Sequence, residues 1–312
     1  MNPSLSVIFF TTASGAGYGM LTWLGLLAPF GWLPPGRGFA LAALAIALLL
    51  VTAGLLSSMA HLGRPGRAWR AFSQWRSSWL SREGVASVLT YIPAGLFGLA
   101  WLIAGRPGPP ALACGLATAA MAVLTVCCTG MIYASLRPIR QWHNGYVLPL
   151  YLLLSLFSGA VCLAAPAGLA GRGVGVLAVL AVLSGAAALA LKLLYWRYID
   201  TAAPISTPES ATGLGPIGRV RSLEWPHTEE NYLLREMGFR IARKHAARLR
   251  AIALLATFAL PLLLGIIGVV LPEAMPPGVV LAAFCALAGL FIERWLFFAE
   301  ATHTVTLYYG RA

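Results

Sequence analysis

The chain has 312 residues, of which 59% are hydrophobic and only 10% are charged, and its formal net charge is +12. A soluble domain carries about 25% charged residues, so this composition excludes an ordinary soluble globular protein. Eight stretches contain no Asp, Glu, Lys or Arg, and each is long enough to cross a bilayer core as a helix of roughly 20 residues. The stretches are 1–36, 38–60, 84–105, 107–136, 144–171, 173–191, 251–272 and 274–292.

These stretches predict an all-α fold: a polytopic membrane bundle of eight transmembrane helices, forming a single membrane-embedded domain over residues 1–312. Helices satisfy their own backbone hydrogen bonds in lipid, whereas a membrane barrel needs alternating segments of about ten residues. The first stretch lacks a basic start and a small-residue cleavage site, so we interpret it as a retained span. Its glycines at positions 15, 17 and 19 are typical of close packing between membrane helices.

The lysines and arginines are concentrated in every second connection between the stretches. The connections after the second, fourth and sixth stretches hold, with their flanks, Arg64, Arg67, Arg70, Arg76, Arg82, Arg137, Arg140, Lys192, Arg197, Arg219, Arg221, Arg235, Arg240, Arg243, Lys244, Arg248 and Arg250. The opposite connections hold only Arg37, Arg106 and Arg172. Because basic residues collect in cytoplasmic loops, we expect these connections and both termini on the cytoplasmic side of a bacterial inner membrane. The net charge then indicates contact with anionic lipid or a cytoplasmic protein, and not nucleic-acid binding.

The only sizeable hydrophilic segment, residues 198–250, is expected to be a long cytoplasmic loop. Its first half is rich in proline and glycine, a composition typical of irregular structure. Its second half predicts a helix that begins near Thr228, with Glu229 and Glu230 in the first turn and basic residues in the last. We expect this helix to lie along the membrane interface and to lead into the seventh span.

Aromatic residues recur at near-helical spacing between the arginines of segment 62–82. They are Trp69, Phe72, Trp75 and Trp79. One interpretation is an interfacial helix with aromatic anchors. The other is an aromatic wall for a planar, lipid-soluble ligand that enters from the bilayer.

The placement of the cysteines and histidines argues against a metal or haem centre. No two cysteines form a C-x-x-C pair, which argues against an iron–sulfur cluster or structural zinc. A membrane cytochrome b holds haem with histidines inside its spans, but here none lies centrally in an apolar stretch. The five histidines are His61, His143, His227, His245 and His303. We therefore expect no haem and no iron–sulfur cluster in this chain.

The main candidate for chemistry lies where the second span ends and the third begins. A hairpin of these two spans would place His61 and Glu83 at the same membrane surface, flanked by Arg64 and Arg82. Reduction of a quinone moves two electrons and two protons, so its site needs hydrogen-bond donors and a proton relay, which these residue types supply. The competing interpretation is a capping and salt-bridge cluster that closes the hairpin.

Ionisable residues also occur at the end of the last span, at Glu293 and Arg294, and His303 follows. Ionisable side chains inside a span cost about 2.5–3.5 kcal/mol each on insertion scales and mark function by default. Near a span end they also serve as anchors, because long side chains reach the interface. These three residues are candidates for a proton relay or for support of the quinone site.

The residues from Ser58 to Trp69, then Trp79 to Glu83, resemble the dimethyl sulfoxide reductase anchor subunit (DmsC) family. The opening Pro3 to Thr12 and the terminal Glu293 to His303 are also similar to it, so the resemblance covers nearly the whole chain. It implies a cofactor-free anchor that exchanges electrons between a quinone, either ubiquinone or menaquinone, and an iron–sulfur subunit. That subunit in turn serves a molybdopterin catalytic subunit.

On the family pattern, His61 is the quinone-site histidine and Glu83 its carboxylate. Arg64, Trp79 and Arg82 lie beside them in the sequence, and the family's later arginine and histidine positions correspond to Arg294 and His303.

The expected orientation departs from the namesake reductase, whose catalytic subunits face the periplasm. It agrees with the anchors of cytoplasmic sulfite dehydrogenases. We therefore expect an anchor, itself non-catalytic for the soluble substrate, that reduces quinone with electrons from sulfite. The alternatives are a quinol-oxidising anchor of a terminal reductase, a structural anchor without a quinone site, a secondary transporter and a haem-bearing cytochrome.

Overall fold

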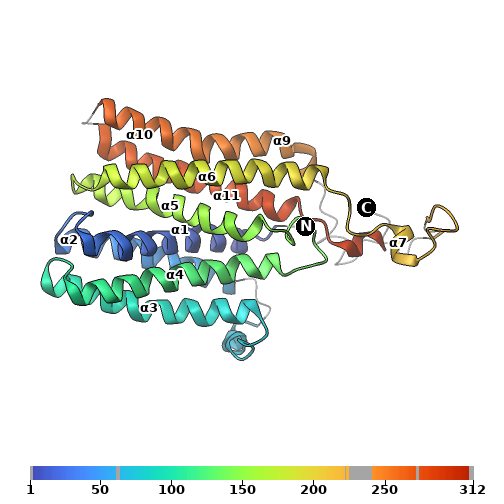
Figure 1. Ribbon diagram of the computed structural model, residues 1–312, viewed down its shortest axis with the longest axis horizontal. Coiled ribbons are helices and arrows are strands. Elements are labelled where there is room, and N and C mark those ends of the chain that lie inside the picture. Colours follow the sequence, from blue (N-terminus) through green and yellow to red (C-terminus); the bar gives the residue numbers. More distant parts are fainter. Residues whose placement is uncertain (1–2, 61–63, 222, 225–240, 272–273, 309–312) are drawn as a thin grey trace.

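The computed structural model describes residues 3–60, 64–221, 223–224, 241–271 and 274–308. These residues form helices and connections without a strand, apart from one isolated bridge between Ile139 and His303. The long helices run side by side along one axis, and their connections lie at the two ends of the bundle (Figure 1). The prediction of an all-α bundle is therefore confirmed for the described residues.

The long helices coincide with the uncharged stretches of the sequence. They are α1 (Leu5–Leu27), α2 (Arg37–Met59), α3 (Trp79–Ala104), α4 (Pro109–Ala134), α5 (Val147–Leu169), α6 (Val174–Thr201), α9 (Ile241–Leu254), α10 (Leu260–Val270) and α11 (Met275–Ala299). A π turn, η3 (Leu255–Ala259), joins α9 to α10 in one continuous helix. The short elements are η1 (Ala28–Phe30), η2 (Pro65–Phe72), α7 (Pro208–Thr212) and η5 (Thr304–Leu307).

The turn between α3 and α4 shows how the sequence ends one long helix and begins the next. Gly105 caps α3 in the left-handed conformation, with a φ of +72° that glycine adopts without strain. Proline then stands in the first turn of α4, where its missing N–H costs no hydrogen bond.

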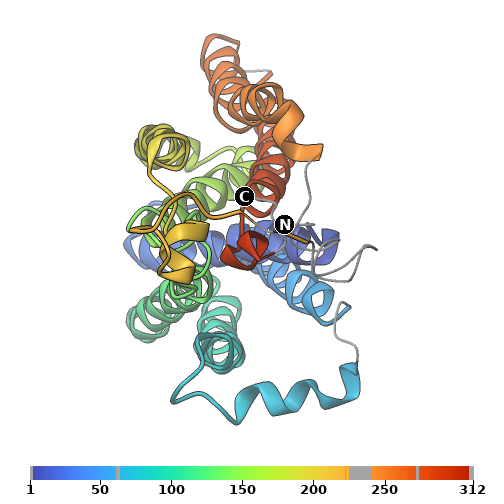
Figure 2. The ribbon, with the colours of Figure 1, turned by 90° about the vertical axis from the view of Figure 1, so that its right-hand side faces the viewer.

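Seven segments of the described chain are long and apolar enough to cross a membrane: α2, α3, most of α4, α5, α6, the joined segment His245–Gly268 and α11. The remaining predicted span corresponds to α1, which has a similar length but carries more hydroxyl and glycine residues. It lies at the centre of the bundle, where most of its residues are buried (Figure 2). The prediction of eight spans is thus confirmed for seven helices, and α1 stays a prediction.

The central helix α1 contacts α2, α4, α5 and α11, while α3 packs on α4 and α6 packs on α5. Small residues allow these close approaches. A Cβ at Gly19 would overlap the Ser155 carbonyl of α5, and one at Gly17 would lie 2.7 Å from the Ala47 carbonyl oxygen of α2. A Cβ at Gly15 would meet nothing within 4 Å. The glycine segment therefore packs helices through two of its three glycines.

Large apolar side chains remain exposed along the outer helices, as at Ile92 and Leu96 of α3 and at Val182 and Leu183 of α6. A soluble monomer rarely exposes apolar patches of this extent. Together with the seven apolar helices, this surface indicates a multi-pass membrane protein.

The connections rich in basic residues lie at one end of the bundle, which we call the basic end; it carries η2, the connection from Ser135 to Tyr146, and α7 (Figure 1). The start of α1 and η5 lie at the same end. The cytoplasmic location of this end stays a prediction.

Three expectations change in detail. Most of the helix predicted to begin near Thr228 lies outside the described residues, and its last part is α9. Lys192, assigned from sequence to the flank of the cytoplasmic loop, is buried inside α6, because that helix continues to Thr201.

The contacts between α2 and α3 also differ from a closed hairpin. Phe39 and Trp101 pack with their ring centroids 5.9 Å apart near the end opposite the basic end, and Thr52 and Tyr91 share a hydrogen bond of 2.7 Å near the middle. At the basic end, η2 runs outside the bundle between the two helices (Figure 2).

Candidate functional site

The residues predicted to bind quinone lie where η2 meets the start of α3, except His61, which falls outside the described residues. Arg64 is exposed and directly precedes η2. Trp79 and Arg82 are half-buried in the first turn of α3, and Glu83 follows them. The structure therefore brings Trp79, Arg82 and Glu83 together on one helix turn.

Arg82 ties the preceding connection to α3. Its Nε donates to the Trp75 carbonyl at 3.0 Å, and its Nη2 donates to the Arg76 carbonyl at 2.7 Å. Its guanidinium carbon lies 4.2 Å from the centroid of the Trp79 ring, a cation–π contact. Arg82 thus orders the aromatic segment and leaves the Trp79 ring at the edge of the site.

The end of η2 is seated on the same turn of α3. The Ser81 hydroxyl donates to the Ala71 carbonyl, and a Cβ at Gly84 would lie 3.2 Å from the Phe72 ring. The other aromatic residues of this segment, Trp69 and Trp75, are 65% and 53% exposed. This arrangement fits both interpretations of the aromatic residues, as interfacial anchors and as one wall of a ligand site.

Glu83 points into the bundle, away from Arg82. It is only 4% exposed, and its Oε1 accepts a hydrogen bond from the Thr129 hydroxyl of α4. Among the described residues, no cation lies within ion-pair distance of this carboxylate. A buried carboxyl group without a counter-charge is costly, and inside a membrane helix it marks function by default.

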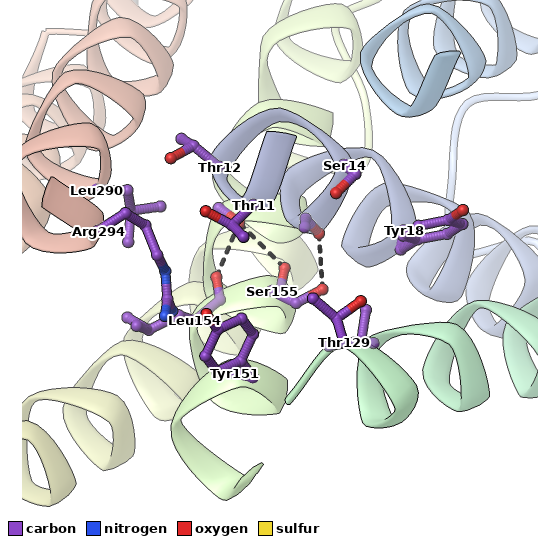
Figure 3. A pocket seen from close by; sticks show the side chains of 13 residues that line it. Thr11, Thr12, Ser14, Tyr18, Thr129, Tyr151, Leu154, Ser155, Leu290 and Arg294 are labelled. Carbon is purple, nitrogen blue, oxygen red and sulfur yellow. Dashed lines mark hydrogen bonds between the residues drawn. The ribbon is translucent and has the colours of Figure 1, made fainter. Parts of the chain in front are cut away.

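Thr129 also lines a small cavity between α1, α4, α5 and α11 (Figure 3). Hydroxyl groups dominate its wall: Thr11, Thr12, Ser14, Tyr18, Thr129, Tyr151, Ser155 and Ser158. Arg294 of α11 lies on the side opposite Thr129, and its guanidinium carbon is 4.0 Å from the centroid of the Tyr151 ring. A polar chamber therefore separates Glu83 from the charged residues of α11.

A second group of charges is buried between α6 and α11. Lys192 donates to Glu293 Oε1, and Arg294 Nε lies 3.2 Å from Glu293 Oε2. The three side chains are at most 5% exposed. They do not reach toward the interface as anchors would, so this cluster belongs to the interior of the bundle.

A third group of charges lies closer to the basic end. Arg250 of α9 donates to both carboxylate oxygens of Asp200, at 2.6 and 2.9 Å, and to Glu300 Oε1 at 2.8 Å. Burial raises the pKa of the Glu300 carboxyl, while the Arg250 guanidinium opposes this shift. The Asp200 side chain is 52% exposed, so this group connects the interior to the surface.

His303 lies apart from these contacts, in the segment after α11. Its Nδ1 accepts a hydrogen bond from the Val305 backbone at 3.0 Å, which caps η5. Burial lowers its pKa. The backbone of the same segment pairs with Ile139, and Thr304 donates to the Pro138 carbonyl at 3.0 Å.

Sequence reasoning missed Lys192, Thr129 and Tyr151. Lys192 directly follows the uncharged stretch 173–191, and that position was the available signal for an intramembrane charge. Thr129 and Tyr151 carried no comparable signal, because single hydroxyl residues are common in membrane helices and usually bond to their own backbone.

Known proteins match the chain over its whole length. The family model of the DMSO reductase anchor subunit (DmsC) matches residues 1–310. A sulfite dehydrogenase subunit of Allochromatium vinosum is 35% identical over 329 residues, which cover 99% of each chain. Anaerobic dimethyl sulfoxide reductase chain YnfH of Escherichia coli is 31% identical over 117 residues, which cover 38% of this chain and 41% of that protein.

A family match across nearly all residues, joined to a relative of equal extent, confirms the resemblance seen around His61 and Glu83. The helical bundle with its apolar outer surface is the architecture that a membrane anchor needs. The chain belongs to the DMSO reductase anchor subunit (DmsC) family and is a membrane anchor subunit of the sulfite dehydrogenase and dimethyl sulfoxide reductase type.

Proposed function

We propose that this anchor subunit exchanges electrons between the quinone pool and an iron–sulfur subunit. Glu83 is the observation that carries the proposal, because a buried carboxyl group without a cationic partner lies one residue from the surface turn of Trp79 and Arg82. A quinone ring that enters from the bilayer beside Trp79 would meet a proton-accepting group on the inner side. The quinone is ubiquinone or menaquinone.

The proposed roles follow from residue chemistry. His61 donates a hydrogen bond to one quinone oxygen, and Glu83 exchanges protons with the ring. Arg64 and Arg82 contribute positive charge at the site, and Trp79 offers a ring face to the head group. Glu293, Arg294 and His303 serve as a proton relay or support the site from behind.

The direction of electron flow is proposed from the relative. The Allochromatium vinosum protein is named as a subunit of a sulfite dehydrogenase, and it is alike along the whole chain. We infer that electrons from sulfite pass through a molybdopterin catalytic subunit and the iron–sulfur subunit into quinone. Both of these subunits would dock on the basic end, facing the cytoplasm from a bacterial inner membrane, since that end gathers most of the arginines.

The test uses the whole complex and two acceptors. Sulfite-dependent reduction of a short-chain quinone reports on the anchor, while reduction of ferricyanide reports on the soluble subunits alone. We expect His61→Ala and Glu83→Gln to lower quinone turnover about 100-fold or more, the range of lost acid–base catalysis, with ferricyanide activity and assembly unchanged. Normal quinone turnover in both variants would overturn the site.

Two other interpretations make different predictions in the same assay. A purely structural anchor leaves quinone turnover insensitive to both substitutions, and a photoreactive quinone analogue does not label this chain. A quinol-oxidising anchor is sensitive to both, but quinol supplies electrons to the catalytic subunit faster than sulfite supplies them to quinone.

A further inference from the structure

The cavity between α1, α4, α5 and α11 has the size of a water site. Its volume is about 20 Å³. One water molecule needs roughly 10–15 Å³ measured in this way, and a quinone ring is far larger. Within the described part of the chain, the buried hydroxyls of Thr12, Tyr18 and Tyr151 have no hydrogen bond of good geometry. Buried polar atoms of this kind are normally satisfied by ordered water.

The two sides of this chamber lead to two buried carboxylates. On one side, Thr129 donates to Glu83. On the other side, Arg294 lines the chamber and lies 3.2 Å from Glu293, which is paired with Lys192. Water in the chamber would connect the proposed quinone site to the charge cluster of α6 and α11.

The same two helices carry the charges onward to the surface. Glu293 and Glu300 are seven residues apart, and Lys192 and Asp200 are eight apart, so each pair is separated by about two helical turns, or roughly 10–12 Å of rise. The Trp196 ring lies between the two levels, with Lys192 Nζ at 4.9 Å and the Arg250 guanidinium at 5.2 Å from its centroid.

Both levels have a carboxylate oxygen with spare hydrogen-bonding capacity. In the described residues, Glu293 Oε2 and Glu300 Oε2 are buried without a hydrogen bond of good geometry. Glu300 is itself held by Arg250, which binds the half-exposed Asp200. The inner and outer levels therefore each combine a carboxylate with a basic side chain.

From this geometry we propose a proton path that runs from Asp200 and Glu300, through Lys192 and Glu293, across the hydroxyl-lined chamber, to Thr129 and Glu83. The proposal rests on the proposed function, since it assigns the route by which protons reach the quinone. It gives α6 and α11 a part in the reaction although they lie on the far side of α1 and α5 from η2 (Figure 2).

The chemistry balances with the components already named. Each quinone takes two electrons from the iron–sulfur subunit and two protons, and becomes a quinol. When Glu83 gives a proton to a reduced quinone oxygen, its carboxylate is left charged in an apolar site. A proton then arrives from Glu293 through water in the chamber, and Glu293 is recharged from the outer level and the solvent.

The test compares variants in the assembled complex under steady-state sulfite oxidation. Lys192→Met and Glu293→Gln are combined, because removing both charges leaves the cluster's net charge unchanged. We expect the double variant to lower kcat for quinone about tenfold and to enlarge the solvent deuterium isotope effect, with an unchanged KM for quinone and unchanged ferricyanide activity. Glu209→Gln, an exposed carboxylate of α7, is the matched control and should behave as the unaltered complex.

The outcomes separate this proposal from the quinone site itself. If Glu83→Gln abolishes quinone turnover but the double variant keeps the kcat and isotope effect of the unaltered complex, the path is overturned and the site stands. If Glu83→Gln is fully active, the proposed function fails instead. Should the double variant assemble poorly, Glu300→Gln tests the outer level, where an unchanged isotope effect also overturns the path.

Discussion

Lys192 of α6 and Glu293 of α11 form an ion pair between residues 101 positions apart, and both side chains are at most 5% exposed. Arg294 adds a second cation to the same carboxylate at 3.2 Å. One buried carboxylate therefore balances two buried cations, and the three substitutions that remove these charges are not equivalent.

Glu293→Gln should be the most damaging single change in this cluster. It leaves Lys192 and Arg294 together without a counter-charge, and breaking a buried pair in this way costs about 3–5 kcal/mol. Lys192→Met should cost less, because Glu293 keeps Arg294. Thermal unfolding of the purified complex should rank the double variant above Glu293→Gln. Equal stability of Glu293→Gln and the unaltered complex would show that the pair contributes little.

Gly19→Ala should destabilise the bundle where Gly15→Ala does not. A Cβ at Gly19 would overlap the Ser155 carbonyl of α5, whereas the same atom at Gly15 meets open space. Overpacking at such a contact costs about 1–3 kcal/mol. The two variants stand on one helix, so their unfolding temperatures in the same detergent make a matched comparison. Similar temperatures for both would contradict the close approach of α1 and α5.

Thr129→Val should lower quinone turnover while Thr118→Val leaves it unchanged. The Thr129 hydroxyl donates to Glu83, whereas the equally buried Thr118 bonds only to the Cys114 carbonyl of its own helix. Losing one hydrogen bond to a buried acceptor costs about 1–3 kcal/mol, which corresponds to roughly a 10- to 100-fold slower step. Sulfite-dependent quinone reduction by the two variant complexes checks this. Equal rates would remove Thr129 from the site.

The segment around η5 should loosen as the pH falls below neutral. Burial lowers the pKa of His303 in the folded chain, so the unfolded segment binds the proton more tightly. The stabilisation is complete above the unfolded pKa of about 6.5 and is lost as the pH falls through the lower, folded value. Protonation also removes the lone pair that accepts from Val305.

Hydrogen–deuterium exchange of residues 300–308 at pH 7 and pH 5 measures this loosening, after correction for intrinsic rates. His303→Asn cannot titrate, and its protection should be independent of pH in this window. If the unaltered chain shows the same protection at both values, His303 does not control this segment.

The basic end should be inaccessible from outside the cell. Ser77 follows η2 at the basic end, and Arg172 lies in the opposite connection between α5 and α6. A membrane-impermeant maleimide should label Arg172→Cys in spheroplasts, and label Ser77→Cys only after lysis. The native cysteines all lie inside α4, α5 or α11, so a chain without added cysteine gives the background. The reverse pattern would place the basic end in the periplasm and contradict the proposed docking side.

Much of this molecule was determined by the sequence alone. Uncharged stretches of about 20 residues or more can hide their backbone in lipid only as helices, so the helices and their approximate ends followed directly from composition. The alternation of basic and neutral connections predicted which helix ends share a surface. The motif around His61 and Glu83 indicated the family, because it combines several specific residues at set spacing.

The tertiary structure decided which helices touch and which polar groups meet. Every face of these stretches is apolar, so no periodic pattern shows which side of α6 or α11 is buried, and Lys192 was assigned to a loop. The contact between Lys192 and Glu293 depends on the packing of two helices, and the contact of Glu83 with Thr129 depends on the packing of α3 against α4. In a membrane, burial in protein and exposure to lipid select the same apolar residues, and only the few polar partners distinguish them.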